Sequence, residues 1–518
     1  MEIYKYKNPI LSGFHPDPSI CRVGDDFYLV NSTFEYFPGI PVYHSKDLIN
    51  WEIIGHCLCD SEQVNLDGAL PSNGLFAPSI CYNNGYFFMT VTNITHDGNI
   101  IVHSHLAAGP WSEPVSVKQY GIDPSLFFDD DGKVYYISTG GDENGRSVIQ
   151  ISEIDPMTGE ILSGPGVINR GCCGRSPEGP HLYKIGGYYY LMLAEGGTEY
   201  GHMETIQRSR SVYGPYEACP HNPIITNRNA EINEICACGH ADLTDDANGN
   251  WWLVCLGIRC LRGSRTVMLH NLGRETFLAP VKWQDGWPVV GNNGRMEEEM
   301  EGPLPAAEGV CPSPYDKSFS DDFSKEERPL RYNFLRMPLL DNYKRQNGTL
   351  ILRGTEKTID DLASPTWVGI RQPEFNVEAV AVIDGVYFSR EDAKAGITAY
   401  YSKDYHYDIF IAPSDDGQLK IKTARHIHDL YAVTNEVVIT DSFKQNGRIY
   451  LRIKASSDYY QLMYSTDGRE YRTLDTASTA GLCTEGTMYM TFTGTYLAMF
   501  AENGTAVFDS FEVKNNPE

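Results

Sequence analysis

The 518-residue sequence has no run of 18 apolar residues, so it predicts no transmembrane helix. Long stretches of Ala, Leu, Glu and Lys are scarce, whereas Gly, Tyr and Asn-Gly or Asp-Gly turns are plentiful, which favours an all-β protein. Basic residues are also few: 42 Lys and Arg stand against 68 Asp and Glu, giving a formal net charge of −26. That charge would repel nucleic acids and anionic membranes, so we expect neither as a partner and expect a neutral or cationic ligand.

No charged and apolar leader with a cleavage site of small residues opens the sequence, so we expect no secretion signal. The 13 cysteines then predict reduced thiols and a cytoplasmic location. Neither the pair Cys172 and Cys173 nor the segment Cys236-Ala-Cys238 has the C-x₂-C spacing of zinc sites. Because Cys236 and Cys238 lie two residues apart, we expect them to share one face of a strand as buried, unreactive thiols.

A repeated unit occurs five times in the first part of the chain. It joins an opening segment, an apolar pair, a Gly, Asp or Asn turn and an aromatic strand. The copies are DPSICRVGDDFYLV from Asp17, APSICYNNGYFFMTV from Ala77, DPSLFFDDDGKVYYI from Asp123, EGPHLYKIGGYYYLM from Glu178 and HADLTDDANGNWWLV from His240. Their starts lie roughly 45 to 60 residues apart, the length of a four-stranded propeller blade, and each copy has the pattern of a β-hairpin. We therefore predict a five-bladed β-propeller over residues 1–302.

The second half of the chain has a different pattern. Met296–Ser318 carries four Pro and an acidic run without a helix or strand period, which predicts a surface linker at residues 303–317. Period-two alternation then appears in three segments, Phe375–Asp384, Arg448–Ala455 and Tyr459–Gly468. Many short alternating strands over about 200 residues predict a β-sandwich, which we place at residues 318–518.

Three of the five repeats open with a carboxylate: Asp17, Asp123 and Glu178. The innermost strands of a propeller surround its axis, so groups at equivalent points of the blades converge at one opening. An Asp beside Pro often simply caps a turn, but three acids at equivalent positions favour a function, and the second copy has alanine there. Three converging carboxyl groups are typical of glycoside hydrolysis. One protonates the leaving oxygen, a second activates water or attacks carbon, and a third raises the pKa of the acid.

The sequence resembles glycoside hydrolase family 43, the β-xylosidase and α-L-arabinofuranosidase group. NPILSGFHPDPSICRVGDDFYLVNSTFEYFPGIPVYHSKDLINW is similar to its N-terminal signature. GIDPSLFFDDDGKVYY, SPEGPHLYKIGGYYYLMLAEGGTEYGH, GHADL and LGRETFLAPVKWQDGWPVV are similar to its later motifs, in the same order. The tail from about Phe319 resembles the C-terminal β-sandwich of many members, a concanavalin-like jelly roll. The resemblance covers nearly the whole chain.

The resemblance implies inverting hydrolysis by a single displacement. Asp17 matches the general base, Glu178 the general acid, and Asp123 the carboxylate that modulates the pKa of the acid and orients it. These are the three residues that the repeats select independently. Inversion requires base and acid carboxyl groups roughly 6.5–9.5 Å apart, which leaves room for water.

Further roles are implied by the same resemblance. Arg274, in LGRET, matches an arginine that contacts the non-reducing sugar, although an ion pair with an acid is the alternative. Phe34 matches an aromatic wall of the pocket, or packs in the core, and Phe76 stands where the family often has Trp. Thr198 matches a pocket residue, or is a turn hydroxyl. His240 matches a histidine beside a bound calcium or a water cluster, although calcium prefers oxygen ligands. No cofactor is expected to be required.

The C-terminal sandwich has two interpretations. It is a carbohydrate-binding module, or, as in the resembled architecture, it packs against the propeller and pushes a loop towards the active-site mouth. Phe492–Phe500 is the segment that we expect to form this loop, with Tyr496 as a contributor.

The predicted function is that of an exo-glycosidase, a β-D-xylosidase that releases xylose from the non-reducing ends of xylo-oligosaccharides. An α-L-arabinofuranosidase, or dual activity on arabinoxylan oligosaccharides, is the first alternative. A non-catalytic sugar-binding propeller, a retaining furanosidase with carboxyl groups roughly 5–5.5 Å apart, and a phosphorylase are more remote. The expected partner is a small oligosaccharide, and a homo-oligomer stays open.

Overall fold

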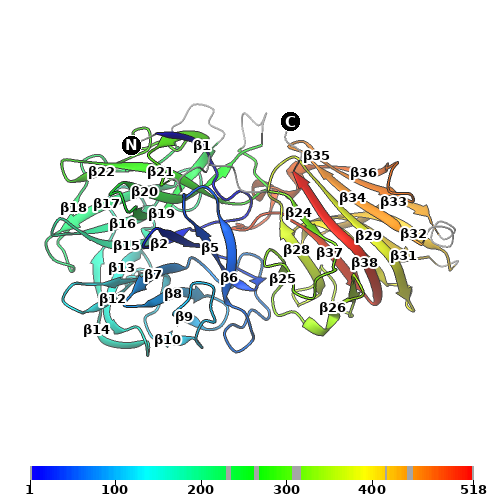
Figure 1. Ribbon diagram of the computed structural model, residues 1–518, viewed down its shortest axis with the longest axis horizontal. Coiled ribbons are helices and arrows are strands. Elements are labelled where there is room, and N and C mark those ends of the chain that lie inside the picture. Colours follow the sequence, from blue (N-terminus) through cyan, green and yellow to red (C-terminus); the bar gives the residue numbers. More distant parts are fainter. Residues whose placement is uncertain are drawn as a thin grey trace.

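The computed structural model describes residues 3–228, 235–261, 268–305, 317–414, 417–439 and 447–515. Within these ranges the chain forms strands, turns and three short 3₁₀ helices, Leu340–Asn342, Thr479–Leu482 and Thr484–Gly486, and no α-helix. Two bodies lie side by side, an N-terminal one in blue to green and a C-terminal one in yellow to red (Figure 1). The all-β prediction is confirmed. Among the described residues, no helix has the length and apolar character needed to cross a membrane.

Five four-stranded antiparallel sheets form the N-terminal body. Blade by blade, their strands are β2 (Ser19–Val23), β3 (Asp26–Val30), β5 (Gly39–Ser45) and β6 (Glu52–Leu58); β7 (Ser79–Asn83), β8 (Tyr86–Asn93), β9 (Gly98–Ser104) and β10 (Val115–Val117); β11 (Ile122–Phe128), β12 (Val134–Gly141), β13 (Ser147–Asp155) and β14 (Glu160–Asn169); β15 (Glu178–Ile185), β16 (Tyr188–Glu195), β17 (Met203–Ser209) and β18 (Glu217–Ala218); β19 (Ile235–Asp245), β20 (Trp251–Arg259), β21 (Glu275–Gln284) and β22 (Trp287–Val290). The first strands β2, β7, β11, β15 and β19 contact one another in a ring that β19 closes against β2. The five-bladed prediction is confirmed.

The hairpin turns lie where the repeats place them. In the second blade, Asn84 and Gly85 join β7 to β8, with φ angles of 49° and 86°. Two successive positive φ angles are the signature of a type I′ turn, whose twist matches that of the flanking strands. The local sequence therefore determines the hairpin that starts the blade.

Asp242 joins three blades around the axis. Its Oδ2 accepts hydrogen bonds from the Ser19 hydroxyl at 2.7 Å and the Ile20 amide at 2.9 Å, both on β2. Its Oδ1 accepts one from the Tyr183 hydroxyl of β15 at 2.6 Å. This buried carboxylate thus holds the first, fourth and fifth blades together, which is a structural role.

Cys236 and Cys238 do not share a face of β19. Ala237 between them has a φ of 53°, and the pairing with β20 shifts register at this point. Such a bulge breaks the alternation of side chains along a strand. Cys236 packs with Ile258 and Cys260, whereas Cys238 lies in the main propeller core. The prediction of a shared face is wrong, and the prediction that both thiols are buried is confirmed.

Two packed sheets form the C-terminal body. Its strands are β24 (Phe319–Asp321), β25 (Asn333–Leu335), β26 (Tyr343–Gln346), β27 (Thr349–Arg353), β28 (Thr366–Arg371), β29 (Val377–Phe388), β30 (Lys394–Ser402), β31 (Tyr405–Pro413), β32 (Leu419–Ile427), β33 (Leu430–Val438), β34 (Ile449–Ala455), β35 (Tyr459–Ser465), β36 (Arg472–Ser478), β37 (Tyr496–Glu502) and β38 (Gly504–Asn515). One sheet has the order β26-β27-β38-β29-β34-β35-β36, with β24 beside β38, and the other β33-β32-β31-β30-β37-β28-β25-β4. The predicted sandwich and its three alternating segments are confirmed.

A strand lies immediately before the predicted linker of residues 303–317. β23 (Glu299–Gly302) pairs antiparallel with the N-terminal strand β1 (Tyr4–Lys7), and Met300 of β23 is buried. The prediction that Met296–Ser318 lacks strands is wrong here, because the edge of β1 is a partner that only the fold brings near. Residues 306–316 of the predicted linker lie outside the described residues.

The propeller contributes a strand to the sandwich. β4 (Tyr36–Phe37), from the first blade, pairs with β25 and completes its sheet. On the face of this sheet that points away from the sandwich core, the ring of Tyr36 stacks on Tyr496 with ring centroids 4.2 Å apart. Tyr36 also contacts Trp367. The propeller therefore covers part of the outer face of this sheet, over β28 and β37.

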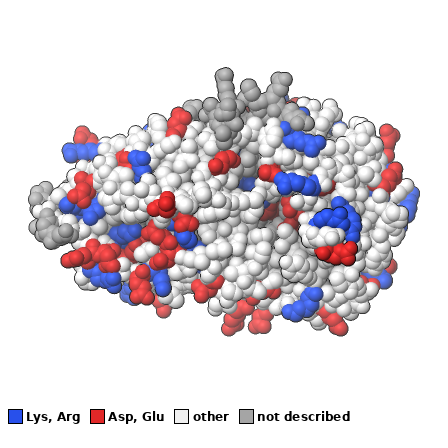
Figure 2. All heavy atoms as spheres, turned by 180° about the vertical axis from the view of Figure 1, so that it is seen from behind, with Lys and Arg blue, Asp and Glu red and all other residues white. Residues whose placement is uncertain are grey.

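Acidic and basic side chains are mixed over the face shown in Figure 2, and the acidic ones gather most densely over the sandwich.

Candidate active site

A small hollow lies where the inner strands of the propeller begin. Its lining residues are Asp17, Phe34, Phe76, Ala77, Ile122, Asp123, Glu178, Thr198, His240, Arg274 and Phe492. The eight residues to which the sequence assigned catalytic, sugar-binding or metal-binding roles all belong to this set.

The five residues that open the repeats, Asp17, Ala77, Asp123, Glu178 and His240, all line this hollow. Equivalent positions of the five blades therefore converge, as the repeat pattern predicts. Asp17, Asp123 and His240 also share a left-handed backbone, with φ angles of 50°, 52° and 50°. Left-handed φ is uncommon for residues other than glycine and gathers at functional sites. The same backbone conformation recurs just before or within the inner strand of three blades.

Asp17 is held by a bidentate ion pair with Arg274. Nη1 of Arg274 donates to Oδ1 at 2.7 Å, and Nη2 donates to Oδ2 at 3.1 Å. The Ser32 hydroxyl also donates to Oδ2, and Nδ1 of His240 lies 3.8 Å from Oδ1. Asp17 and Arg274 are 3% and 5% exposed, so water screens this pair little. The orientation of the Asp17 carboxylate is thus fixed from two sides.

Glu178 and Asp123 are carboxyl groups that favour protonation. Burial and the charge of Asp17 raise the pKa of Glu178 to about 7, against a weaker opposing effect of Arg274. Burial and the charges of Glu178 and Asp17 raise the pKa of Asp123 well above its usual range. The two groups titrate as a linked pair, so the site retains a transferable proton near neutral pH.

Three aromatic rings form one wall of the hollow. Phe34 lies 5.4 Å from Phe76 and stacks on Phe492 at 5.9 Å, measured between ring centroids. Phe34 is 3% exposed and also packs in the cluster between the two bodies. It therefore both lines the pocket and packs in the core. The guanidinium of Arg274 lies 5.5 Å from the ring of Phe34 and 5.3 Å from that of Phe492.

Phe492 comes from the sandwich and is the first residue of the segment that the sequence predicted to approach the mouth, although Tyr496 was the contributor named there. Its amide donates to the Ser72 hydroxyl at 2.8 Å, and its carbonyl accepts from Nε of Arg274 at 3.3 Å. Next to it, Gly494 lies so close to the propeller that a Cβ would stand 2.1 Å from the Leu272 carbonyl oxygen. This contact brings the sandwich loop to the mouth.

The expectation for the segment Phe492–Phe500 is therefore confirmed for Phe492. It is wrong for Tyr496, which is fully buried against Tyr36 and does not line the hollow. No sequence motif marked Phe492, because its position depends on packing between the two bodies.

His240 was the residue expected beside a calcium ion. Burial lowers its pKa to about 4, so its imidazole is neutral at physiological pH. Calcium takes six to eight oxygen ligands, and the nearby carboxylates Asp17 and Asp242 are already engaged by protein donors. The described residues around His240 do not form such an oxygen shell, so we assign no step to calcium, which stays a prediction.

Two buried carboxyl groups with raised pKa values, a fixed carboxylate and an aromatic wall together define a site for hydrolysis of a glycosidic bond. The model of glycosyl hydrolases family 43 matches residues 6–288, and that of the beta xylosidase C-terminal concanavalin A-like domain matches residues 320–514. The chain therefore belongs to glycosyl hydrolases family 43 and is a glycoside hydrolase.

Known proteins resemble the chain over nearly its full length. The non-reducing end alpha-L-arabinofuranosidase BoGH43B of Bacteroides ovatus is 40% identical over 97% of this chain and 92% of its own. A xylosidase/arabinosidase of Butyrivibrio fibrisolvens is 38% identical over 92% of this chain and 94% of its own. The crystal structure of a xylan beta-1,4-xylosidase from Bacillus halodurans C-125 superimposes with a TM-score of 0.91 at 30% identity, over 98% of this chain and 100% of that one.

Proposed function

We propose that the protein removes single β-D-xylosyl units from the non-reducing ends of xylo-oligosaccharides, with inversion at the anomeric carbon. The observation that carries the proposal is the convergence of Asp17, Asp123 and Glu178 in one small hollow. An α-L-arabinofuranosyl unit is the second substrate class, because relatives of similar identity carry both activities in their names.

In the proposed reaction, Asp17 takes a proton from a water molecule whose oxygen attacks the anomeric carbon. The bond from that carbon to the glycosidic oxygen breaks, and Glu178 gives its proton to the leaving oxygen. The pKa of Glu178, raised to about 7, suits this role, because an acid must still hold its proton at the working pH. The negative charge of Glu178 raises the pKa of Asp123, so the two neighbouring carboxyl groups favour a state in which the pair keeps a proton.

The closed side of the hollow supports action at chain ends. Phe492 places a sandwich residue against Phe34 and Phe76, and the Ser72 and Arg274 contacts hold it there. A continuous polysaccharide crossing the site would need both ends of a groove to be open. A pocket blocked on one side accepts a terminal sugar, with the leaving chain extending outwards.

Leaving-group dependence tests the assigned roles. Xylobiose needs protonation of its leaving oxygen, whereas 4-nitrophenyl β-D-xylopyranoside has a leaving group that departs with little help. Glu178→Gln should therefore lower kcat for xylobiose by about 10²–10⁴-fold and affect the nitrophenyl substrate much less. Asp17→Asn should lower both, because water activation is needed for either substrate. The matched control is Asp131→Asn, an exposed acid in a turn of the third blade.

A folded Glu178→Gln protein that cleaves xylobiose at the wild-type rate would overturn the assignment of the acid. A wild type that binds xylobiose without cleaving it would favour a sugar-binding propeller. Comparison with 4-nitrophenyl α-L-arabinofuranoside ranks the two substrate classes.

A further inference from the structure

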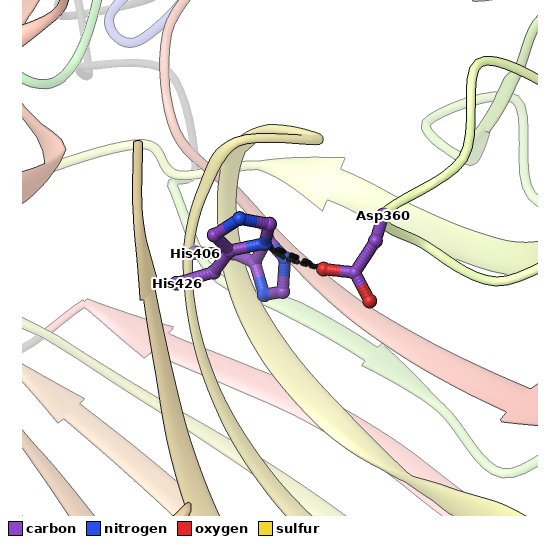
Figure 3. A group of neighbouring side chains, drawn as sticks. All are labelled: Asp360, His406 and His426. Carbon is purple, nitrogen blue, oxygen red and sulfur yellow. Dashed lines mark hydrogen bonds and ion pairs between the residues drawn. The ribbon is translucent and has the colours of Figure 1, made fainter. Parts of the chain in front are cut away.

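A second cluster of chemically active side chains lies in the sandwich, outside the active site. Asp360 belongs to the segment between β27 and β28, and His406 and His426 are direct cross-strand partners on β31 and β32. Figure 3 shows the carboxylate of Asp360 pointing at the two imidazole rings. Among the described residues, this is the one group of three His, Cys, Asp or Glu whose ligand atoms all lie within 4.8 Å of one another.

The outer partners of both imidazoles determine which nitrogens face the cluster. Nδ1 of His406 lies 2.9 Å from each oxygen of Asp408, and Nε2 of His426 lies 2.9 Å from the His428 carbonyl oxygen. Each of these nitrogens must carry a hydrogen, because its neighbour is an acceptor. In the neutral imidazoles, the other nitrogens, Nε2 of His406 and Nδ1 of His426, then present lone pairs.

Three lone pairs therefore converge on one point. Nε2 of His406 lies 3.0 Å from Oδ1 of Asp360, Nδ1 of His426 lies 2.5 Å from the same oxygen, and the two nitrogens are 3.2 Å apart. A tetrahedral zinc site with ligand bonds near 2.0–2.1 Å has ligand atoms about 3.3 Å apart. Small movements of these side chains would admit the ion. Oriented imidazoles backed by a carboxylate and a carbonyl are typical of metal sites.

The surrounding charge suits a divalent cation. Asp360, Asp408 and Glu502 contribute three negative charges, and Lys394 contributes one positive charge through its ion pair with Glu502. Two nitrogens and one carboxylate oxygen are a donor set for zinc and related transition metals rather than for calcium or magnesium, which prefer oxygen ligands.

We propose that Asp360, His406 and His426 bind one Zn²⁺ ion, with water completing its coordination. Asp408 and the His428 carbonyl act as positioning groups that hold the two imidazoles. The ion joins the segment of residues 354–365 to strands β31 and β32. Ile359 in that segment is fully buried and its amide donates to Glu502, so the segment already lies against the sheet. Zinc therefore acts as a clamp at a distance from the hydrolytic site.

The alternative is a metal-free cluster in which a protonated histidine forms hydrogen bonds and ion pairs with the carboxylates. Burial lowers the pKa of His406, but the charges of Asp408 and Asp360 outweigh it and raise the pKa to about 9. A positively charged His406 would then bridge the two carboxylates without any metal. The experiment must therefore separate metal binding from hydrogen bonding.

Calorimetric titration with ZnCl₂ and thermal unfolding distinguish metal binding from hydrogen bonding. Both use the untagged full chain after treatment with EDTA and dialysis. All proteins carry Cys172→Ser and Cys173→Ser, because these exposed neighbouring thiols would also take zinc. Asp360→Asn and His426→Ala remove one ligand each and concern side chains that are 30% and 13% exposed, so folding should survive. His428→Asn is the matched control, since it leaves the carbonyl in place and changes an exposed ring.

We expect one equivalent of zinc to bind to the background protein and to the His428→Asn control, with a rise in the unfolding midpoint. Each ligand variant should bind at least about tenfold more weakly and lose that rise. Absence of stoichiometric binding, or equal binding by the ligand variants, would overturn the proposal and leave the cluster as a hydrogen-bonded one. Neither result depends on xyloside hydrolysis.

Discussion

The guanidinium of Arg274 holds the carboxylate of Asp17 through two hydrogen bonds, of 2.7 Å and 3.1 Å. The same guanidinium donates through Nε to the carbonyl of Phe492, which belongs to the sandwich. One side chain therefore connects the proposed base with the residue that closes the pocket. The position of the C-terminal body and the orientation of the catalytic carboxylate are linked at Arg274.

Arg274→Lys should lower kcat/KM for 4-nitrophenyl β-D-xylopyranoside by about 100-fold. An ammonium group is a single point donor and cannot reproduce the planar fork on Asp17, and small misplacement of a reacting group is costly. Steady-state kinetics check the change, and circular dichroism checks the fold. A folded variant within about twofold of the wild type would show that the bidentate contact is dispensable.

Phe492→Ala should raise KM about tenfold, because it removes an aromatic wall whose contacts are worth about 1 kcal/mol or more. The effect on kcat should be smaller, since no proposed acid or base is altered. Met490→Ala is the matched control: Met490 lies two residues away and is 56% exposed. Equal kinetics of the two variants would contradict a role for the sandwich in the pocket.

Activity should fall as the pH rises past about 7. The pKa of Glu178 is raised to about 7 by burial and the charge of Asp17, and the proposed acid works only while protonated. The pH profile of kcat/KM for xylobiose measures this limb, whose apparent pKa belongs to the linked pair of Glu178 and Asp123. A profile that stays flat to about pH 9 would contradict the assignment.

Stability should fall between about pH 4.5 and 7 because of Glu35. This carboxyl is 2% exposed, and burial raises its pKa to about 7, against weaker opposing contacts from its own backbone, Arg336 and Ser72. The folded state then binds a proton more tightly than the unfolded state, so raising the pH through this window costs up to about 3 kcal/mol of unfolding free energy.

Glu35→Gln mimics the protonated side chain and should reduce the loss of stability on going from about pH 5 to about pH 8. Urea unfolding of the wild type and of the variant at both pH values measures this difference in unfolding free energy. An unchanged difference between the two pH values would show that Glu35 is ionised without penalty in the folded protein.

The repeats predicted the propeller because each carries its own turn chemistry, as at Asn84 and Gly85, and its own alternation. They also predicted the convergence of Asp17, Asp123 and Glu178, since equivalent positions of a closed ring must meet. Asp242 shows the limit of that reasoning. It belongs to the fifth repeat, yet its hydrogen bonds to Ser19 and Tyr183 make it a structural link between blades.

The remaining features depend on contacts between distant segments. Phe492 reaches the pocket only because Ser72 and Arg274 hold its backbone, and no local pattern encodes that meeting. Asp360, His406 and His426 lie far apart in the sequence and have no motif spacing, so only the register of β31 and β32 brings them together.

Proton NMR of the first sugar released from 4-nitrophenyl β-D-xylopyranoside by the wild-type protein tests the central claim most directly. A β-xyloside hydrolysed by one displacement with water at the carboxyl triad gives α-xylose first, and the β-anomer then grows in by mutarotation. That order is the result we predict. Initial release of β-xylose would contradict inversion and make Asp17 a nucleophile, and no turnover by the folded protein would contradict the proposed substrate.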